Sequence, residues 1–148
     1  LKSGMHLELG DSPKINRRGF TITAEFDATG LDGVIVAQGG SRHGYALCLQ
    51  HGKMTFMTRV SGTLTSVSGD VTLTGPHTAV AELATDGTII LQVDGKQVGQ
   101  GKATSAVTMM PTDGLDVGED TGGLVGNYSK TNSFPGTIKS VSIELLAK

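Results

Sequence analysis

The sequence predicts an all-β protein, built as a two-sheet antiparallel β-sandwich, and three observations lead to this fold class. Residues 20–27 (FTITAEFD) alternate strictly, with apolar side chains at the even positions and polar ones at the odd positions. This period of two is typical of a half-buried strand. The chain has 22 glycines in 148 residues, which fits many turns. No stretch of ten or more residues carries the apolar i, i+3, i+4, i+7 pattern of a long helix.

The clearest stretch is residues 88–98 (TIILQVDGKQV), in which Ile89, Leu91 and Val93 share one face of a predicted strand. Asp94-Gly95 follows, and this dipeptide readily adopts the positive φ angles of a two-residue hairpin. A second turn is predicted at Asp86-Gly87, after the AVAELA run. We therefore expect a strand–turn–strand–turn–strand meander in the middle of the chain.

The remaining chain supplies further short strands and one long loop. Strands are expected at 3–9, 20–26, 34–37, 45–49 and 54–60, one or two edge strands within 61–75, a weak strand with a bulge within 99–108, and strands at 115–117 and 136–145, the last with a bulge near Lys139-Ser140. Roughly eleven strands at intervals of 8–12 residues are typical of a sandwich. The unbroken apolar run Val34–Ala37 predicts a central strand covered on both faces. A loop as long as residues 118–135 predicts a functional or ordering role.

Size, charge and composition bound the function. The chain is expected to form a single domain, residues 1–148. A formal charge of −2 argues against nucleic-acid binding, and no apolar run approaches the ~20 residues that span a bilayer. The only cysteine, Cys48, has no partner for an internal disulfide and is expected to be a small buried hydrophobe.

The meander and two other stretches carry a family resemblance. Residues 77–96 (HTAVAELATDGTIILQVDGK) resemble the middle of a laminin-G or concanavalin A-like jelly-roll domain. Residues 33–56 (GVIVAQGGSRHGYALCLQHGKMTF), the VDGK hairpin and residues 115–145 (LDVGEDTGGLVGNYSKTNSFPGTIKSVSIEL) together resemble the β-sandwich module at the C-terminus of bacterial arylsulfatases. The sulfatase catalytic sequence C/S-x-P-x-R is absent.

The resemblance implies a concanavalin A-like jelly roll excised from a larger multidomain protein. It also implies a secreted, periplasmic or cell-surface location in a bacterium, and an appended catalytic domain. Neither enzymatic motifs nor metal-type histidine spacing are found in this chain: it has no E-x-D-x-x-E strand motif, no G-x-S-x-G elbow and no closely spaced histidines. The adjacent Glu119 and Asp120 are expected in a solvated turn or as a cap bonded to the backbone. We predict that the chain is not an enzyme.

Carbohydrate binding is the function that the loops favour. Without Trp, a broad aromatic platform for neutral chains is not expected. Arginine presents a planar fork that suits sulfate or carboxylate, so the predicted ligand is an anionic polysaccharide, with sulfated chains included. The site is expected at the 42–45 loop and the 120–130 loop, aided by Arg59. The candidate residues are Arg42, His43, Tyr45, Arg59, Asp120, Asn127, Tyr128 and Lys130.

Three further possibilities stay open at this point. No cofactor is required, but a structural calcium ion would find oxygen ligands in Asp116, Glu119 and Asp120, with Asp113 and Asn127 nearby; turn formation explains the same residues. The chain is alternatively a structural accessory domain that packs on a catalytic domain and binds no glycan. A protein-binding adhesion module of the laminin-G type is the third possibility.

Overall fold

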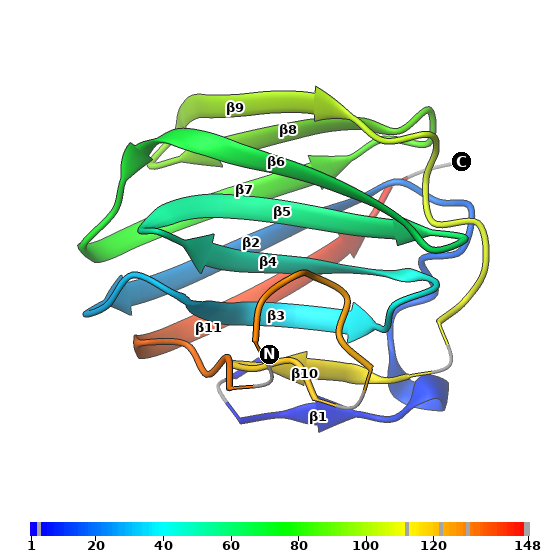
Figure 1. The fold of residues 1–148 in the computed structure, drawn as a ribbon, viewed down its shortest axis with the longest axis horizontal. Coiled ribbons are helices and arrows are strands. Elements are labelled where there is room, and N and C mark those ends of the chain that lie inside the picture. Colours follow the sequence, from blue (N-terminus) through cyan, green and yellow to red (C-terminus); the bar gives the residue numbers. More distant parts are fainter. Residues whose placement is uncertain (3, 112, 122, 130, 147–148) are drawn as a thin grey trace.

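The protein is a sandwich of two antiparallel β-sheets, seen in a computed structural model that describes residues 1–2, 4–111, 113–121, 123–129 and 131–146 (Figure 1). The first sheet has six strands among these residues, in the order β1-β10-β3-β4-β5-β6. Its strands are β1 (His6–Leu7), β10 (Leu115–Val117), β3 (Gly33–Gly39), β4 (Gly44–Gln50), β5 (Lys53–Val60) and β6 (Thr63–Thr72).

The second sheet has five strands among the described residues, in the order β11-β2-β7-β8-β9. Its strands are β11 (Gly136–Leu145), β2 (Phe20–Ala28), β7 (Gly75–Leu83), β8 (Thr88–Val93) and β9 (Lys96–Lys102). The predicted all-β fold class, with two antiparallel sheets, is confirmed. The described residues contain no helix that could cross a membrane.

The core lies between the two sheets, as the alternation in the sequence predicts. In β2 the apolar positions Phe20, Ile22, Ala24 and Phe26 are buried, whereas Thr21, Thr23 and Glu25 face outward and are half-buried or exposed. The predicted meander is β7-β8-β9, with Ala81 opposite Leu91 and Val93 opposite Lys96. The turn between β8 and β9 is Asp94-Gly95, and these two residues have positive φ angles of 52° and 81°. These angles are the ones that a two-residue hairpin requires.

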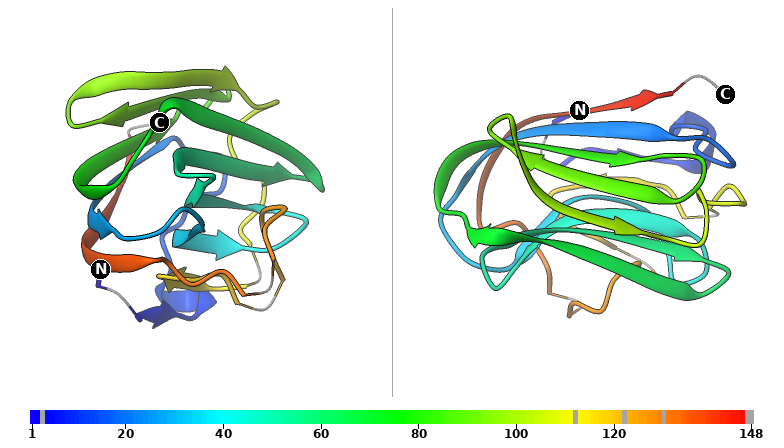
Figure 2. Two further views of the ribbon diagram at one scale, coloured as in Figure 1. Left: turned by 60° about the vertical axis from the view of Figure 1, so that its left-hand side comes forward. Right: turned by 90° about the horizontal axis from the view of Figure 1, so that it is seen from above.

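The central strand β3 is buried along its whole length, which confirms that both of its faces are covered. On the inner face lies the main core. On the outer face the long loop 118–135 crosses the strands, and Figures 1 and 2 show it on the side of the six-stranded sheet that faces away from the second sheet. Between this loop and the sheet lies a second apolar cluster, in which Val125 of the loop joins residues of the sheet: Val34, Ala37, Ala46, Cys48 and Met57. Cys48 is free and buried, as predicted.

Three details of the predicted strands differ from the structure or sharpen the prediction. The strand expected at 3–9 is limited to His6–Leu7, because a 3-10 turn begins at Leu9 and the Ser12 hydroxyl donates to the Glu8 carbonyl at 2.8 Å. The weak strand expected at 99–108 begins earlier and ends at Lys102, because the tight hairpin pairs Lys96 directly with β8. The bulge in β11 is confirmed between Ile138 and Ser140.

Candidate functional site

The loop 118–135 is held together from within by Asp120, whose side chain is only 3% exposed. Its Oδ2 atom accepts hydrogen bonds from the backbone N–H of Val125, at 2.9 Å, and from the hydroxyl of Tyr128. The side chain of Asn132 completes the arrangement by accepting from the N–H of Asp120 at 2.8 Å and donating to its carbonyl at 3.1 Å. The loop is therefore ordered by its own polar groups as well as by the apolar cluster beneath it.

Burial sets the protonation of these groups. It raises the pKa of Asp120 to about 6, although the hydrogen bonds from Tyr128 and Val125 act in the opposite direction. Burial and the neighbouring Asp120 carboxylate also raise the pKa of Tyr128. Tyr128 therefore stays a neutral hydroxyl that donates to Asp120, and its ring is fixed in one place.

A second carboxylate joins this loop to the N-terminal strand. Asp116 in β10 accepts from the backbone N–H of Thr121 at 3.1 Å and from its hydroxyl at 2.6 Å, and it lies 2.5 Å from Nδ1 of His6 in β1. Burial alone would raise the pKa of Asp116, but the hydrogen bonds from Thr121 and His6 hold it below its usual value. The same contact with Asp116 raises the pKa of His6. These side chains have a structural role.

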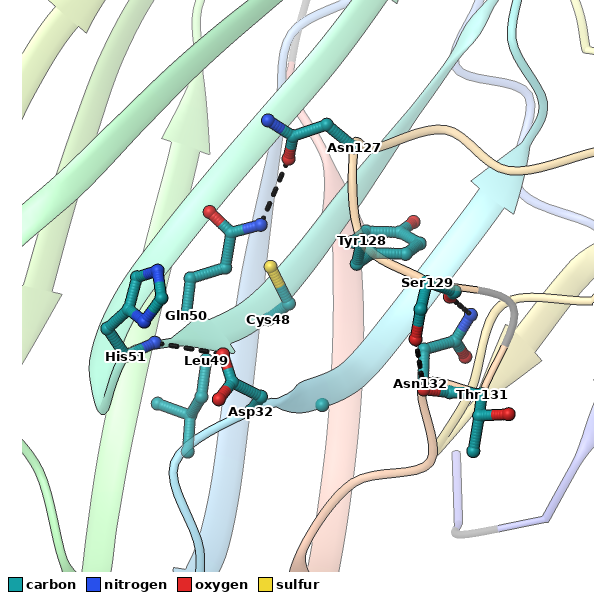
Figure 3. Close-up of a pocket in the computed structure, with 11 residues that line it drawn as sticks. Asp32, Cys48, Leu49, Gln50, His51, Asn127, Tyr128, Ser129, Thr131 and Asn132 are labelled. Atoms are coloured by element: carbon teal, nitrogen blue, oxygen red, sulfur yellow. Dashed lines mark hydrogen bonds between the residues drawn. The ribbon is translucent and has the colours of Figure 1, made fainter.

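A cavity of about 480 Å³ opens between the loop 118–135 and the end of the β3–β4 pair (Figure 3). We call it the loop pocket; it is lined by Asp32, Gly33, Cys48, Leu49, Gln50, His51, Asn127, Tyr128, Ser129, Thr131 and Asn132. Gln50 Nε2 donates to Asn127 Oδ1 at 3.0 Å, which bridges the sheet to the loop. The Asp32 carboxylate accepts from the N–H of His51 at 3.0 Å.

The lining of the loop pocket is chemically suited to hydroxyl groups. A carboxylate, side-chain amides, hydroxyls and an imidazole offer both donors and acceptors, and the Tyr128 ring adds an apolar surface. Burial raises the pKa of the Cys48 thiol to about 12, so this thiol is not a nucleophile at neutral pH. Neither Lys nor Arg is among the described lining residues, so an anionic group has no strong partner in this pocket.

A second hollow, of about 350 Å³, lies at the opposite end of the β3–β4 pair. We call it the Arg42 hollow; its lining residues are Gly40, Ser41, Arg42, His43, Met109, Met110 and Pro111. The β3–β4 register separates the two sites, because Gly39 pairs with Gly44 beside the Arg42 hollow and Gly33 pairs with Leu49 beside the loop pocket. With seven residues in β4, the two ends are roughly 20 Å apart.

The structure divides the residues that the sequence assigned to one site. Asn127 and Tyr128 line the loop pocket, whereas Arg42 and His43 line the Arg42 hollow. Arg59 pairs with Gly44 at the Arg42 end of the strands but lines neither hollow. It donates to the Val125 carbonyl at 2.7 Å and to the Gly62 carbonyl at 2.9 Å, so it fastens the loop to β5. Lys130 is outside the described residues.

Two of the predicted ligand contacts need correction. Tyr45 is fully buried on the inner face of β4, where its hydroxyl donates to Gln38 at 2.9 Å and its ring packs on Phe20. It cannot touch a ligand at the surface, because alternation turns it toward the core while Ala46 and Cys48 face the loop. Asp120 also lies below the surface, and its contribution is to hold Tyr128 in place.

The side chains of the calcium candidates bind different partners and do not point at one common place. Asp116 faces His6 and Thr121, Asp120 faces Tyr128 and Val125, and Glu119 is exposed. Within the described part of the chain, no group of three or more His, Cys, Asp or Glu side chains could hold a metal ion. A structural calcium ion stays a prediction from the sequence.

The sequence analysis missed the sheet side of the loop pocket, which comes from Asp32, Gln50 and His51. The sequence nevertheless contained a usable signal, namely the expected neighbouring strands at 34–37 and 45–49. When two such strands pair antiparallel, the residues that precede the 34–37 strand lie beside those that follow the 45–49 strand. Both positions lie in connections between predicted strands, to which the sequence analysis assigns no site. Nothing in the sequence pattern predicts that the loop crosses this end of the two strands.

Comparisons with known proteins show the fold. No family model matches the sequence, and no curated protein matches it. Among solved structures, domains LG4-5 of the mouse laminin α1 chain have a TM-score of 0.72 at 21% identity, over 97% of this chain and 40% of that chain. The CBM40 domain of a Ruminococcus gnavus IT-sialidase, solved with α2,6-sialyllactose, has a TM-score of 0.67 at 11% identity, over 98% of this chain and 87% of that chain.

A third similar structure is the LG1-3 region of the laminin α2 chain, with a TM-score of 0.66 at 17% identity, over 91% of this chain and 30% of that chain. The present chain thus spans well under half of the two laminin structures. These similarities confirm the expected laminin-G-like, concanavalin A-like sandwich. The relationship to arylsulfatase modules stays a prediction from the sequence.

Proposed function

We propose that this chain is a non-catalytic carbohydrate-binding module and that the loop pocket holds one sugar unit of a polysaccharide. The observation that carries this proposal is the lining of the loop pocket, where Asp32, Gln50 and Asn127 converge from the sheet and from the loop. Its volume, about 480 Å³, falls within the roughly 300–1,000 Å³ of small-molecule sites.

Hydroxyl recognition explains the choice of side chains. A sugar hydroxyl both donates and accepts, and the Gln50–Asn127 pair, together with Asp32, offers partners of both kinds. The Tyr128 ring provides an apolar surface for the C–H face of a sugar, and its hydroxyl is already engaged by Asp120. The ring is thus held in position before a ligand arrives, which lowers the entropic cost of binding.

The structural neighbours support a glycan as the ligand class. One of them is a carbohydrate-binding domain solved with α2,6-sialyllactose. A shared fold does not fix function, so this similarity adds weight only together with the lining of the loop pocket.

The proposed polysaccharide carries carboxylate or sulfate groups, as the sequence analysis expected. The exposed Arg42 at the far end of the β3–β4 pair provides a fork for such a group. By the resemblance to arylsulfatase modules, the domain would bring an appended hydrolase or sulfatase to its polymer, outside the bacterial cytoplasm.

The rival function is a structural accessory domain, which would present an apolar patch to its catalytic partner. The large apolar side chains that are exposed among the described residues come from separate segments: Met5, Leu9, Leu31, Val71 and Met109. The polar loop pocket therefore favours the glycan-binding function over this rival.

Affinity electrophoresis against soluble neutral, carboxylated and sulfated polysaccharides, with and without calcium, tests the proposal. Gln50→Ala and Asn127→Ala should each weaken retardation by about tenfold, equivalent to a loss of ~1.4 kcal/mol. Gln97→Ala is the matched control, because Gln97 is an exposed amide on β9. Migration that no polysaccharide alters would reject the proposal in favour of the accessory domain.

A further inference from the structure

The Arg42 hollow combines a free positive charge with an apolar wall of methionines, whereas no Lys or Arg is among the described residues that line the loop pocket. Arg42 is exposed in the turn between β3 and β4, and no hydrogen bond or ion pair among the described residues engages its guanidinium. Arg59 is the useful contrast, because its guanidinium donates to two backbone carbonyls. An arginine fork that lines a hollow without a protein partner is available for a carboxylate or a sulfate.

His43 is the second polar group of the Arg42 hollow. It is half-buried, and its Nε2 atom is buried without a hydrogen-bond partner. Buried polar atoms are nearly always paired, so an unpaired nitrogen beside a hollow calls for an explanation. Because the imidazole torsion has a broad energy well, a small turn of the ring toward a bound ligand would give this nitrogen a partner.

Methionines form the opposite wall. Met109 is 61% exposed, which is the largest exposed fraction among the large apolar side chains of the described residues. Met110 and Pro111 continue this wall next to Gly40 and Ser41. Methionine adapts its shape to a ligand because it is unbranched and has several rotatable bonds. A purely ionic ligand would leave this apolar surface in water.

We propose that the Arg42 hollow is a second subsite, which takes an anionic group that has an apolar substituent beside it, as in an acidic sugar with an N-acetyl group. Arg42 binds the anion, His43 adds a hydrogen bond, and Met109 covers the methyl group. The proposal rests on the proposed function, since it assigns the acidic units of the same polysaccharide to this subsite and other units to the loop pocket.

Asp113 tunes this subsite. Its Oδ2 atom lies next to Gly40, where a Cβ on that glycine would be only 2.6 Å away. The carboxylate therefore adds negative potential at the edge of the Arg42 hollow and opposes a second negative charge on the ligand. A singly charged carboxylate is favoured over a densely sulfated chain.

NMR titration with three monosaccharides tests the proposal. The probes are N-acetylneuraminic acid, which has both features; glucuronic acid, which has only the carboxylate; and N-acetylglucosamine, which has only the acetamide. We expect the first to bind at least tenfold more tightly than the other two and to shift the amide signals of residues 40–43 and 109–111. Arg42→Gln should weaken it more than tenfold, Met109→Ser about threefold, and Asp113→Asn should strengthen it about twofold.

Lys96→Gln is the control, because it removes one exposed positive charge at the start of β9. All four substituted side chains are exposed, so the fold should persist, and thermal melting checks this. Unchanged affinity in Arg42→Gln, or shifts confined to the loop pocket, would overturn the second subsite. If polysaccharide retardation still depended on Gln50 in that case, the proposed function would stand; loss of all retardation by every polysaccharide would remove both.

Discussion

The outer faces of the two sheets differ in how much of their surface is exposed to solvent. In the five-stranded sheet, the outward positions of β8, such as Ile90 and Gln92, are half-buried, and inward positions alternate with them. In the six-stranded sheet, Ala46 and Met57 also point outward but are completely buried, because the loop 118–135 lies on them. An alternating strand marks a face left to solvent, whereas a continuously apolar strand marks a face that another segment must cover.

The cover on the six-stranded sheet is also what makes a site. A loop that crosses a sheet has backbone polar groups to satisfy, and here Asp120 and Asn132 satisfy several of them inside the loop. The same crossing leaves the loop pocket at one end of the strands. The stability of the cover and the geometry of the pocket are therefore linked.

The largest expected effect comes from removing a buried side chain under the loop. Met57→Ala should lower the free energy of unfolding by about 2–4 kcal/mol, because it leaves a cavity beneath Val125. The matched substitution Ile90→Ala, on the outward face of the other sheet, should cost about 1 kcal/mol or less, because that side chain is half-buried. Urea denaturation measures both values. Equal losses would show that the loop is not a structural cover.

An intermediate effect is expected at Asp120. Asp120→Ala leaves the Val125 N–H and the Tyr128 hydroxyl without their acceptor and should cost about 1–3 kcal/mol. Asp120→Asn keeps an acceptor at the same place and should cost much less. Both variants are compared with the native chain by thermal melting.

The pH dependence separates these roles further. The pKa of Asp120 is raised from 3.8 to about 6 in the folded protein, so the folded state holds the proton more tightly than the unfolded state. Its contribution is present in full below pH 3.8 and is lost as the pH rises through 6. The free energy of unfolding should fall by about 1–2 kcal/mol across this window relative to Asp120→Asn. If stability changed with pH in the same way in both proteins, the pKa of Asp120 would not be raised in the folded state.

The smallest expected effect is at the contact between His6 and Asp116, which joins β1 to β10 at the edge of the six-stranded sheet. Asp116 raises the pKa of His6, so the stabilisation is present in full below the ordinary value of 6.5 and is lost as the pH rises through the raised value. His6→Gln should therefore lower the melting temperature by a few degrees at pH 5.5 and leave it nearly unchanged at pH 8.5. A deficit of the same size at both values would contradict the assigned ion pair.

The two regions were unequally predictable. For the meander of the five-stranded sheet, the period of two and the Asp94-Gly95 turn were enough, because hairpin register is set by neighbouring residues. For the loop, the sequence indicated only its length and its polar content. Where the loop lies on the sheet depends on contacts between residues far apart in the chain, such as Gln50 with Asn127.

The sequence by itself determined the all-β class, the apolar faces of β2 and β8, the coverage of Val34–Ala37 on both sides and the bulge in β11. Each of these follows from local backbone geometry and from the cost of leaving apolar surface in water. Only the tertiary structure decided that Tyr45 is in the core, that Arg59 fastens a loop, and that Arg42 and Asn127 belong to separate hollows. The reason is that the path of a long loop depends on which distant surface it can cover, and the period of the residues contains no information about that choice.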